Sequence, residues 1–164
     1  PYIRVSDMTS NTELSIDGML RTSSEIAKKY ERSKVSSGDI VVALRGAVGL
    51  PKVIPPELEG ANLTQGTARV SVRSDFSTDY VYWALQSPQI TRQIKRYSKG
   101  STFSEISLKA LRTMQLPAVT ESIQQEIGSQ LNSYRDAIRS ISARIDELNT
   151  LLIETRQKVL FERT

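Results

Sequence analysis

The spacing of apolar residues separates a C-terminal helix from an N-terminal region of mixed pattern. From residue 127 to residue 159, apolar side chains recur alternately after four and after three positions. The residues of this seam are Ile127, Leu131, Tyr134, Ile138, Ile141, Ile145, Leu148, Leu152 and Val159, with Thr155 in the remaining position. A mean repeat of about 3.5 residues keeps an apolar seam facing a second helix, whereas the seam would drift around a lone straight helix. The pattern therefore predicts a long helix over about residues 119–162 that pairs with another helix through these residues.

The first 118 residues show short segments of alternating or helical pattern instead. The pattern predicts strands at 2–5, 40–44, 52–54, 67–72 and 114–117, and helices at 23–30, 79–86, 89–97 and 107–111. We expect Ser6-Asp7 to end the first strand, residues 60–66 to form a polar loop, and Thr78 to cap a helix. The predicted fold class is α+β: a mixed α/β globular domain over residues 1–118, followed by a coiled-coil helix over residues 119–164.

The residue types that the chain lacks exclude most catalytic chemistry. It contains no cysteine and no histidine. Disulfides, thiolate or imidazole metal ligands, cysteine nucleophiles and every Ser-His-Asp arrangement are therefore excluded. The sequence has no GxxxxGK[ST] nucleotide-binding motif, and its only adjacent prolines, Pro55-Pro56, do not form the Asn/Asp-Pro-Pro-Tyr/Phe tetrapeptide of adenine methyltransferases. We therefore predict a non-catalytic protein that holds no metal or other cofactor.

No segment of the sequence has the pattern of a membrane span. The longest nearly apolar run, from Ile40 to Leu50, is interrupted by Arg45 and is too short to cross a bilayer. No signal peptide precedes it, and a chain without cysteine suits a reducing compartment, so we expect a cytoplasmic protein without a membrane partner. Because the chain opens on Pro1 rather than Met, we also expect that an N-terminal part of the domain is missing.

Five segments precede the long helix in a distinctive order. They are PYIRV (1–5), SGDIVVALRGAVG (37–49), NLTQG (62–66), DYVYWALQSPQI (79–90) and KGSTFSEISLKALRTMQLP (99–117). In this order, and followed by a heptad helix, they resemble the specificity subunit of type I restriction-modification systems. The resemblance covers essentially the whole chain, as one target recognition domain and one spacer helix.

The resemblance implies a protein that recognises double-stranded DNA. The globular domain would read one half of a split target, and the helix would fix the gap between the two half-sites. The family usually carries two such units in tandem, with antiparallel spacer helices, whereas this chain has one unit. A second copy of the chain would then supply the mate for the helix, giving a homodimer. The resemblance also implies methyltransferase subunits as partners and makes a motor-nuclease subunit a further candidate.

Positive charge is concentrated in the globular part and adds support for a polyanionic partner. Residues 1–118 hold 16 Lys and Arg against 11 Asp and Glu, whereas residues 119–164 hold 6 against 7. The densest cationic stretch has helical spacing and leads into a small polar loop, which we predict to contact phosphates. Its residues are Arg92, Lys95, Arg96 and Lys99, with Ser101 and Thr102 in the loop. A merely solvated helix face would have the same pattern.

Two further groups of residues are candidates for contact with DNA. Arg45 ends the predicted strand at 40–44 and is followed by Gly46, which would let backbone approach a phosphate. Asn62, Thr64 and Gln65 carry side chains able to pair with base edges, an amide with adenine in particular. An arginine at a sheet edge and an ordinary polar loop would look the same.

Two other classes of function fit the sequence. One is a coiled-coil interaction module whose globular head binds protein, and the other is the recognition fragment of a fused methyltransferase-nuclease. Steep weakening of binding with salt would separate a DNA-binding protein from the first alternative.

Overall fold

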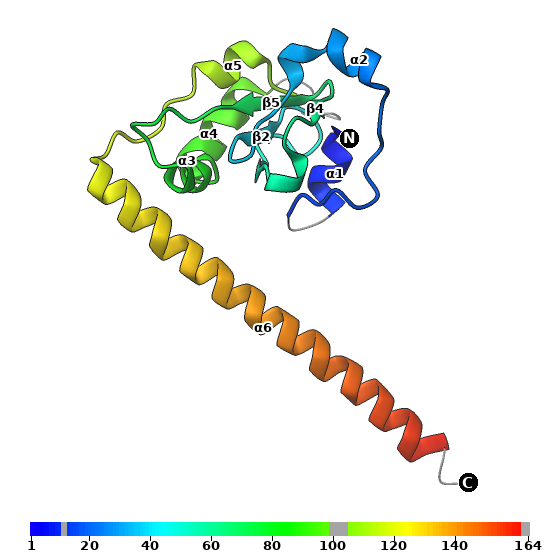
Figure 1. Cartoon of the computed structure of the whole chain (residues 1–164). Helices are drawn as coiled ribbons and strands as arrows, with labels where there is room; N and C mark the ends of the chain where they lie inside the picture. Colours follow the sequence, from blue (N-terminus) through cyan, green and yellow to red (C-terminus); the bar gives the residue numbers. More distant parts are fainter. Residues whose placement is uncertain (11–12, 99–104, 162–164) are drawn as a thin grey trace. The chain divides into compact units, whose positions relative to one another are not determined.

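The computed structural model describes residues 1–10, 13–98 and 105–161 (Figure 1). The strands are β1 (Tyr2–Ile3), β2 (Ile40–Ala43), β3 (Pro51–Val53), β4 (Asn62–Leu63) and β5 (Thr67–Val70). The helices are α1 (Val5–Ser10), α2 (Ser24–Lys29), α3 (Thr78–Leu85), α4 (Pro88–Tyr97), α5 (Leu108–Arg112) and α6 (Glu121–Phe161), with short 3-10 turns at Glu31–Ser33 and Pro56–Leu58. The chain divides into two compact units, Pro1–Gly128 and Ser129–Thr164. The α+β class predicted from the sequence, with its long C-terminal helix, is confirmed.

Strand β2 is the centre of the first unit because both of its faces are buried. Val41 and Ala43 point into one apolar cluster, together with residues of β1 and α1, whereas Ile40 and Val42 point into a second cluster with α3. Helices α1 and α3 accordingly lie on opposite sides of β2 (Figure 1). A strand that is buried on both faces is apolar at every position, which explains the continuous apolar run of the sequence.

Hydrogen bonding places β2 between β3 and β5 in an antiparallel sheet. Ile40 lies opposite Val53 on one side and opposite Val70 on the other. Strands β1 and β4 form a separate parallel pair, in which Tyr2 lies opposite Asn62. This pairing brings the N-terminus of the chain against residues 62–63, which were predicted as part of a polar loop. That prediction is wrong because the backbone of β4 finds hydrogen-bond partners in β1.

Serine residues cap the helices of the first unit. The hydroxyls of Ser23, Ser77, Ser87 and Ser107 each accept a hydrogen bond from the backbone N–H three residues later, at the starts of α2, α3, α4 and α5. The cap of α3 is therefore Ser77, and the prediction of Thr78 was one residue late. Ser6-Asp7 also lies within α1 rather than ending a strand, because the Asp7 carboxylate accepts the Arg4 backbone N–H at 2.8 Å.

Residues 114–117 do not form the strand that the sequence predicted. Side chains satisfy their backbone instead of a neighbouring strand. The Gln115 N–H donates to the Gln93 side chain at 3.0 Å, and the Tyr80 hydroxyl donates to the Pro117 carbonyl at 2.7 Å. Burial raises the pKa of the Tyr80 hydroxyl further above neutrality, so the group donates as a neutral phenol. This segment therefore crosses the surface as an extended connector between α5 and α6.

The first two turns of α6 are fixed to α3. Gln124 is 3% exposed; its Oε1 accepts the Ser77 N–H at 2.9 Å, and its Nε2 donates to the Val119 carbonyl at 3.1 Å. Gly128 is also buried, and a Cβ there would lie 2.9 Å from the Cβ of Asp79, so glycine is required for this close approach. Ile127 packs against the cluster that contains β2 and α3. The start of α6 is therefore part of the first unit.

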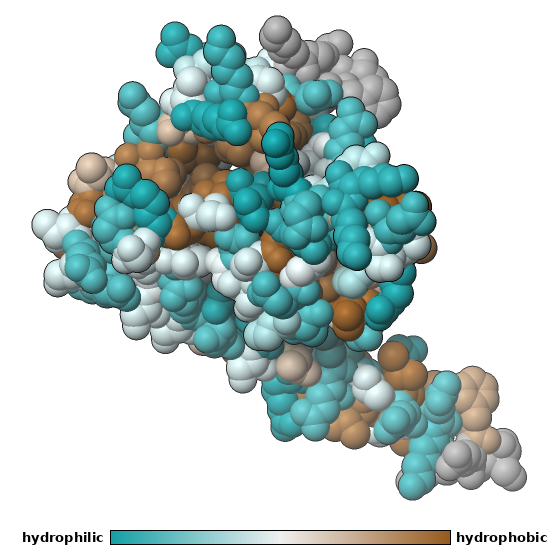
Figure 2. All heavy atoms as spheres, turned by 45° about the horizontal axis from the view of Figure 1, so that its top comes forward, coloured by the Kyte–Doolittle hydropathy of each residue, from teal (hydrophilic) through white to brown (hydrophobic). Residues whose placement is uncertain are grey.

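The remainder of α6 leaves its apolar seam uncovered. The apolar seam residues from Tyr134 to Val159 are between 50% and 64% exposed. Figure 2 shows hydrophobic patches among hydrophilic side chains on the part of the helix seen at the lower right. At about 1.5 Å per residue, the 41 residues of α6 form a rod about 60 Å long. Among the described residues, no helix is both long and apolar enough to cross a membrane.

Gln124→Ala should lower the free energy of unfolding by about 1–3 kcal/mol, because it leaves the Ser77 N–H and the Val119 carbonyl without partners. Gln125→Ala is a matched control, since Gln125 is exposed on the next position of the same helix. It should change the free energy by no more than about 0.5 kcal/mol. Urea unfolding followed by circular dichroism measures both. Equal stabilities of the two variants would contradict the role given to Gln124.

Candidate nucleic-acid interface

Helix α4 carries three exposed cations on two of its sides. Arg92 and Arg96, one turn apart, line a polar recess of about 480 Å³ whose other walls include Gln89 and Thr113. Among the described residues, neither guanidinium makes an ion pair or a side-chain hydrogen bond. Gln93, between them in sequence, exchanges two hydrogen bonds with the backbone of Gln115 and fixes α4 to the connector that follows α5. The two arginines are therefore held on a rigid surface and are available to an anion.

Lys95 faces a different recess, of about 550 Å³, between α4 and the turn at residues 46–51. Gly49 in this turn has a φ of +86°, and the Ile94 side chain occupies the place where a Cβ would lie. Glycine thus permits both the backbone conformation and the contact with α4. The structure therefore divides the described cations of the cationic stretch predicted from the sequence between two recesses, Arg92 and Arg96 in one and Lys95 in the other. The other predicted contacts of this stretch and its loop, Lys99, Ser101 and Thr102, lie outside the described residues.

Arg45 lies across the turn between β4 and β5. Its side chain occupies the space beside Gly66, where any Cβ would collide with it, and Gly66 has a φ of +92°. The backbones also meet, since the Leu44 N–H donates to the Gly66 carbonyl at 2.7 Å. Within the described part of the chain, the Arg45 guanidinium has no acidic partner. The fold therefore brings the exposed Arg45 next to Gln65, twenty residues later in the sequence.

The three polar residues predicted to read bases have different surroundings. Gln65 is exposed, and its amide forms no hydrogen bond with the described residues. The Thr64 hydroxyl donates to the Ile3 carbonyl at 2.9 Å, which leaves only its lone pairs for a ligand. Asn62 is 7% exposed. Of the three, only Gln65 presents an amide that is free to meet a base edge.

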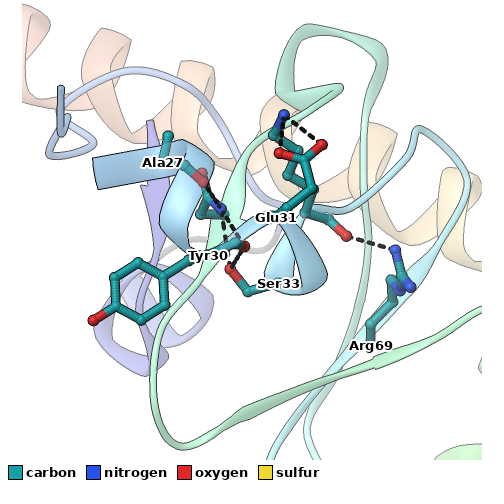
Figure 3. A network of polar contacts seen from close by, with 7 residues as sticks. Ala27, Tyr30, Glu31, Ser33 and Arg69 are labelled. Atoms are coloured by element: carbon teal, nitrogen blue, oxygen red, sulfur yellow. Dashed lines mark hydrogen bonds and ion pairs between the residues drawn. The ribbon is translucent and has the colours of Figure 1, made fainter. Parts of the chain in front are cut away.

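The Asn62 amide holds the C-terminal end of α2. Its Nδ2 donates to the Tyr30 carbonyl at 3.0 Å and to the Ser33 hydroxyl at 3.0 Å, with a longer contact of 3.5 Å to the Ala27 carbonyl (Figure 3). Arg69 supports the same region by donating to the Lys34 carbonyl at 2.6 Å. These contacts occupy the amide donors within the protein, so the burial of Asn62 argues against the base contact predicted for it.

Two apolar side chains, one within α2 and one directly after it, join the candidate site although no sequence motif pointed to them. Ile26 and Tyr30 are 48% and 63% exposed and line a recess of about 490 Å³ together with Gln65 and Leu63. The Tyr30 ring extends away from the polar contacts of its own carbonyl (Figure 3). Their spacing of four residues in an otherwise polar helix was the available signal. The hydrogen bonds of the Asn62 amide hold this region beside the segment that carries Gln65.

Arg4, near the N-terminus, is a cation that the structure pairs internally. Its guanidinium donates to both carboxylate oxygens of Asp7, at 2.6 and 3.1 Å. This hydrogen bonding lowers the pKa of the Asp7 carboxyl and raises the pKa of Arg4. The pair is ionised at neutral pH, and Arg4 adds little net positive charge to the surface. Among the described residues, no group of three or more acidic side chains is arranged to hold a metal ion.

Comparison with known proteins identifies the family. Residues 1–150 match the family described as the type I restriction modification DNA specificity domain, and the chain belongs to this family. The fold supports this membership. The S subunit of a type I restriction-modification system from M. genitalium has a similar structure over 76% of this chain and 33% of that chain, with a TM-score of 0.61 and 18% sequence identity.

Two curated relatives are specificity subunits of type I restriction enzymes. The EcoBI subunit of Escherichia coli is 27% identical over 154 residues, which cover 91% of this chain and 32% of that subunit. The MjaIX subunit of Methanocaldococcus jannaschii is 22% identical over 155 residues, covering 94% of this chain and 35% of that subunit. This chain thus spans about a third of the length of these relatives. The matches favour neither the coiled-coil interaction module nor the fused methyltransferase-nuclease.

Alanine substitution of Asn62 and of Gln65 should have different effects on stability, because the Asn62 amide supports the fold whereas the Gln65 amide faces solvent. Asn62→Ala should lower the free energy of unfolding by about 1–3 kcal/mol, because the Tyr30 carbonyl at the end of α2 and the Ser33 hydroxyl lose the donor that the buried Asn62 supplies. Gln65→Ala removes an exposed amide from the same turn and should stay within about 0.5 kcal/mol of the parent. Both are measured by urea unfolding. A Gln65→Ala variant as unstable as Asn62→Ala would show that Gln65 also serves the fold.

Proposed function

We propose that this chain is a non-catalytic DNA-recognition subunit of a type I restriction-modification complex, and that it reads one half of a split double-stranded target. The observation that carries the proposal is the family match over residues 1–150. The excess of positive charge in residues 1–118 and the exposed cations of α4 support it. Methylation and cleavage would come from partner subunits, a methyltransferase and a motor-nuclease, in the cytoplasm where the complex meets DNA.

Within this function, the exposed side chains divide into two tasks. Arg92, Arg96 and Lys95 would bind phosphates, which position a protein on the duplex without reading its sequence. Arg45 and Gln65 would contact base edges, since a guanidinium pairs with guanine and an amide with adenine in the major groove. Thr64 would accept a hydrogen bond at the edge of the same contact, since its hydroxyl proton is given to the Ile3 carbonyl. Lys99, Ser101 and Thr102 remain predicted phosphate contacts, and we leave the buried Asn62 out of the proposed contact set.

A second copy of the chain would complete the recognition unit. Pairing of α6 through the seam from Ile127 to Val159 would give a homodimer with two-fold symmetry. Antiparallel pairing would place a recognition domain at each end, about 60 Å apart along the helices. Two turns of duplex extend about 68 Å, so the helix has a suitable length to set the gap between half-sites. We propose residues 1–118 as the recognition domain and residues 119–164 as the spacer.

Replacing the two arginines of α4 should weaken DNA binding and reduce its dependence on salt. The double variant Arg92→Ala/Arg96→Ala removes about two phosphate contacts, so the slope of log affinity against log salt should fall by about two. Fluorescence anisotropy with a duplex selected by the chain and its methyltransferase measures this effect. Arg144→Ala is the control, since that arginine lies on α6 and pairs with Glu147. An unchanged slope in the double variant would refute phosphate contact by α4.

Shortening α6 by one heptad should change the spacing of the half-sites and leave their sequences unchanged. Deletion of residues 140–146 shortens the helix by about 10.5 Å, which corresponds to about three base pairs. Selection of protected sites from a randomised duplex pool, with the methyltransferase present, measures the spacing. A deletion of four residues is the comparison, because it shortens the helix by only about 6 Å and breaks the heptad register, which locally distorts the pairing of the helices. Selected sites with an unchanged gap would contradict the spacer role.

A further inference from the structure

Helix α2 presents an apolar face that the fold leaves uncovered. None of the residues of this helix is buried. Ile26 and Tyr30, the residue directly after the helix, are both exposed, and neither belongs to an apolar cluster of the described core. Because they are four residues apart, they lie on one side of the helix, where they line the recess of about 490 Å³ together with Leu63 and Gln65. Exposed apolar side chains that gather at a recess, here called the α2 recess, indicate a binding surface.

Hydrogen bonds fix the walls of the α2 recess. The Asn62 amide donates to the Tyr30 carbonyl at 3.0 Å, which holds the end of α2 against β4. The Thr64 hydroxyl donates to the Ile3 carbonyl at 2.9 Å, which holds the turn before Gln65 against β1. The Gln65 amide itself forms no hydrogen bond with the described residues. The recess therefore places one free amide beside an apolar wall in a preorganised arrangement, which reduces the entropy cost of binding.

The α2 recess differs in chemistry from the recess beside α4. Arg92 and Arg96 line the α4 recess, which suits a phosphate. None of the described residues that line the α2 recess is charged, and Ile26, Tyr30 and Leu63 make part of its wall apolar. A phosphate in the α2 recess would lose water without gaining a charged partner. The chemistry of the walls therefore favours an uncharged occupant with an apolar group and a hydrogen-bonding edge for the Gln65 amide.

The segment that carries the apolar face is basic. Residues 21–32 hold four Lys or Arg against two Glu. Arg21, Lys28 and Arg32 are exposed, and within the described part of the chain they form no ion pair. An uncharged recess in a basic segment fits a ligand that carries an apolar group close to negative charges. In the major groove of DNA that group is the C5-methyl of thymine, and phosphates flank it on both strands.

We propose that the α2 recess reads one A·T base pair from the major groove, with the Gln65 amide on adenine and with Ile26 and Tyr30 against the methyl group of the paired thymine. The inference rests on the DNA recognition of the proposed function and adds the identity of one base pair and the residues that select it. An amide both donates and accepts, as the N7 and N6 groups of adenine require, and the thymine methyl lies on the same edge of the pair. A G·C pair lacks this methyl group and would set the cytosine amino group against the apolar wall.

Deoxyuridine tests the methyl contact on the unaltered protein, because it differs from thymidine only by the missing C5-methyl group. The probe is the duplex that the chain selects from a randomised pool together with its methyltransferase, with one thymine at a time replaced. At one A·T pair of a half-site, the replacement should weaken binding about fourfold, the effect expected for one methyl group that binding removes from water. Fluorescence anisotropy with the complete chain measures the affinities.

Three variants assign the effect to the α2 recess. Ile26→Ala/Tyr30→Ala removes the apolar wall and keeps the Tyr30 carbonyl that Asn62 binds, so it should bind thymine and deoxyuridine duplexes equally at that pair. Gln65→Ala should weaken binding by about tenfold, keep the preference for thymine, and lose nothing further when 7-deazaadenine, which lacks N7, replaces the paired adenine. Leu108→Ala is the control, since Leu108 is as exposed as Ile26 and lies on α5 outside the recess. It should keep the affinity and the fourfold preference of the parent, and urea unfolding checks that each variant is folded.

The outcomes separate this inference from the DNA recognition on which it rests. If the chain and its methyltransferase select no sequence from the pool, both the proposed function and the inference fail. If a duplex is selected and no deoxyuridine replacement weakens binding, the inference alone is overturned. The same follows if the Ile26→Ala/Tyr30→Ala variant keeps the full preference for thymine, because another surface then holds the methyl group. A variant of these two residues that binds the selected duplex like the parent but no longer binds the methyltransferase would assign the recess to that subunit, which also overturns the inference.

Discussion

The close contact between α3 and the first two turns of α6 is the constraint on which the architecture depends. A helix can transmit distance only if its first turns do not move against the domain that it carries. Here the contact requires glycine at position 128, because a Cβ would collide with Asp79. It also uses the buried amide of Gln124 to join the cap of α3 to the connector before α6. Packing of Ile127 on the core completes the attachment.

The same contact divides the apolar seam of α6 into two functions. Its first residues serve the core of the globular unit, whereas those from Tyr134 onward are exposed and would face the second copy in the proposed dimer. One continuous heptad seam therefore contributes both to the fold of a single chain and to the proposed assembly of two chains.

The candidate DNA surface is assembled from segments that are distant in sequence. Arg45 follows β2 and Gln65 lies between β4 and β5, and Gly66 lets the arginine lie across that turn. The arginines of α4 are held by hydrogen bonds between Gln93 and the backbone of Gln115. Rigid support of this kind lowers the entropy cost of binding, since fewer side-chain and loop conformations are lost.

Local patterns predicted most of the elements because their physical causes are local. The long helix, the buried strand β2 and the short helices follow from periodicity and from serine caps. The errors occurred where partners are distant. Strand β4 exists only because β1 pairs with it, and residues 114–117 are not a strand because Gln93 and Tyr80 satisfy their backbone. Asn62 looked like a polar loop residue, yet its amide is needed by α2, which lies about thirty residues earlier.

The sequence by itself determined the α+β class, the absence of cysteine and histidine chemistry, the basic character of the first unit and the heptad seam. Each of these depends on residue type and spacing alone. Only the tertiary structure decided which polar groups are free for a ligand. Gln65 and Asn62 are both amides of one short segment, and they differ because the Asn62 amide finds backbone carbonyls within reach while the Gln65 amide faces solvent. Such a difference depends on contacts between distant segments, which no local pattern records.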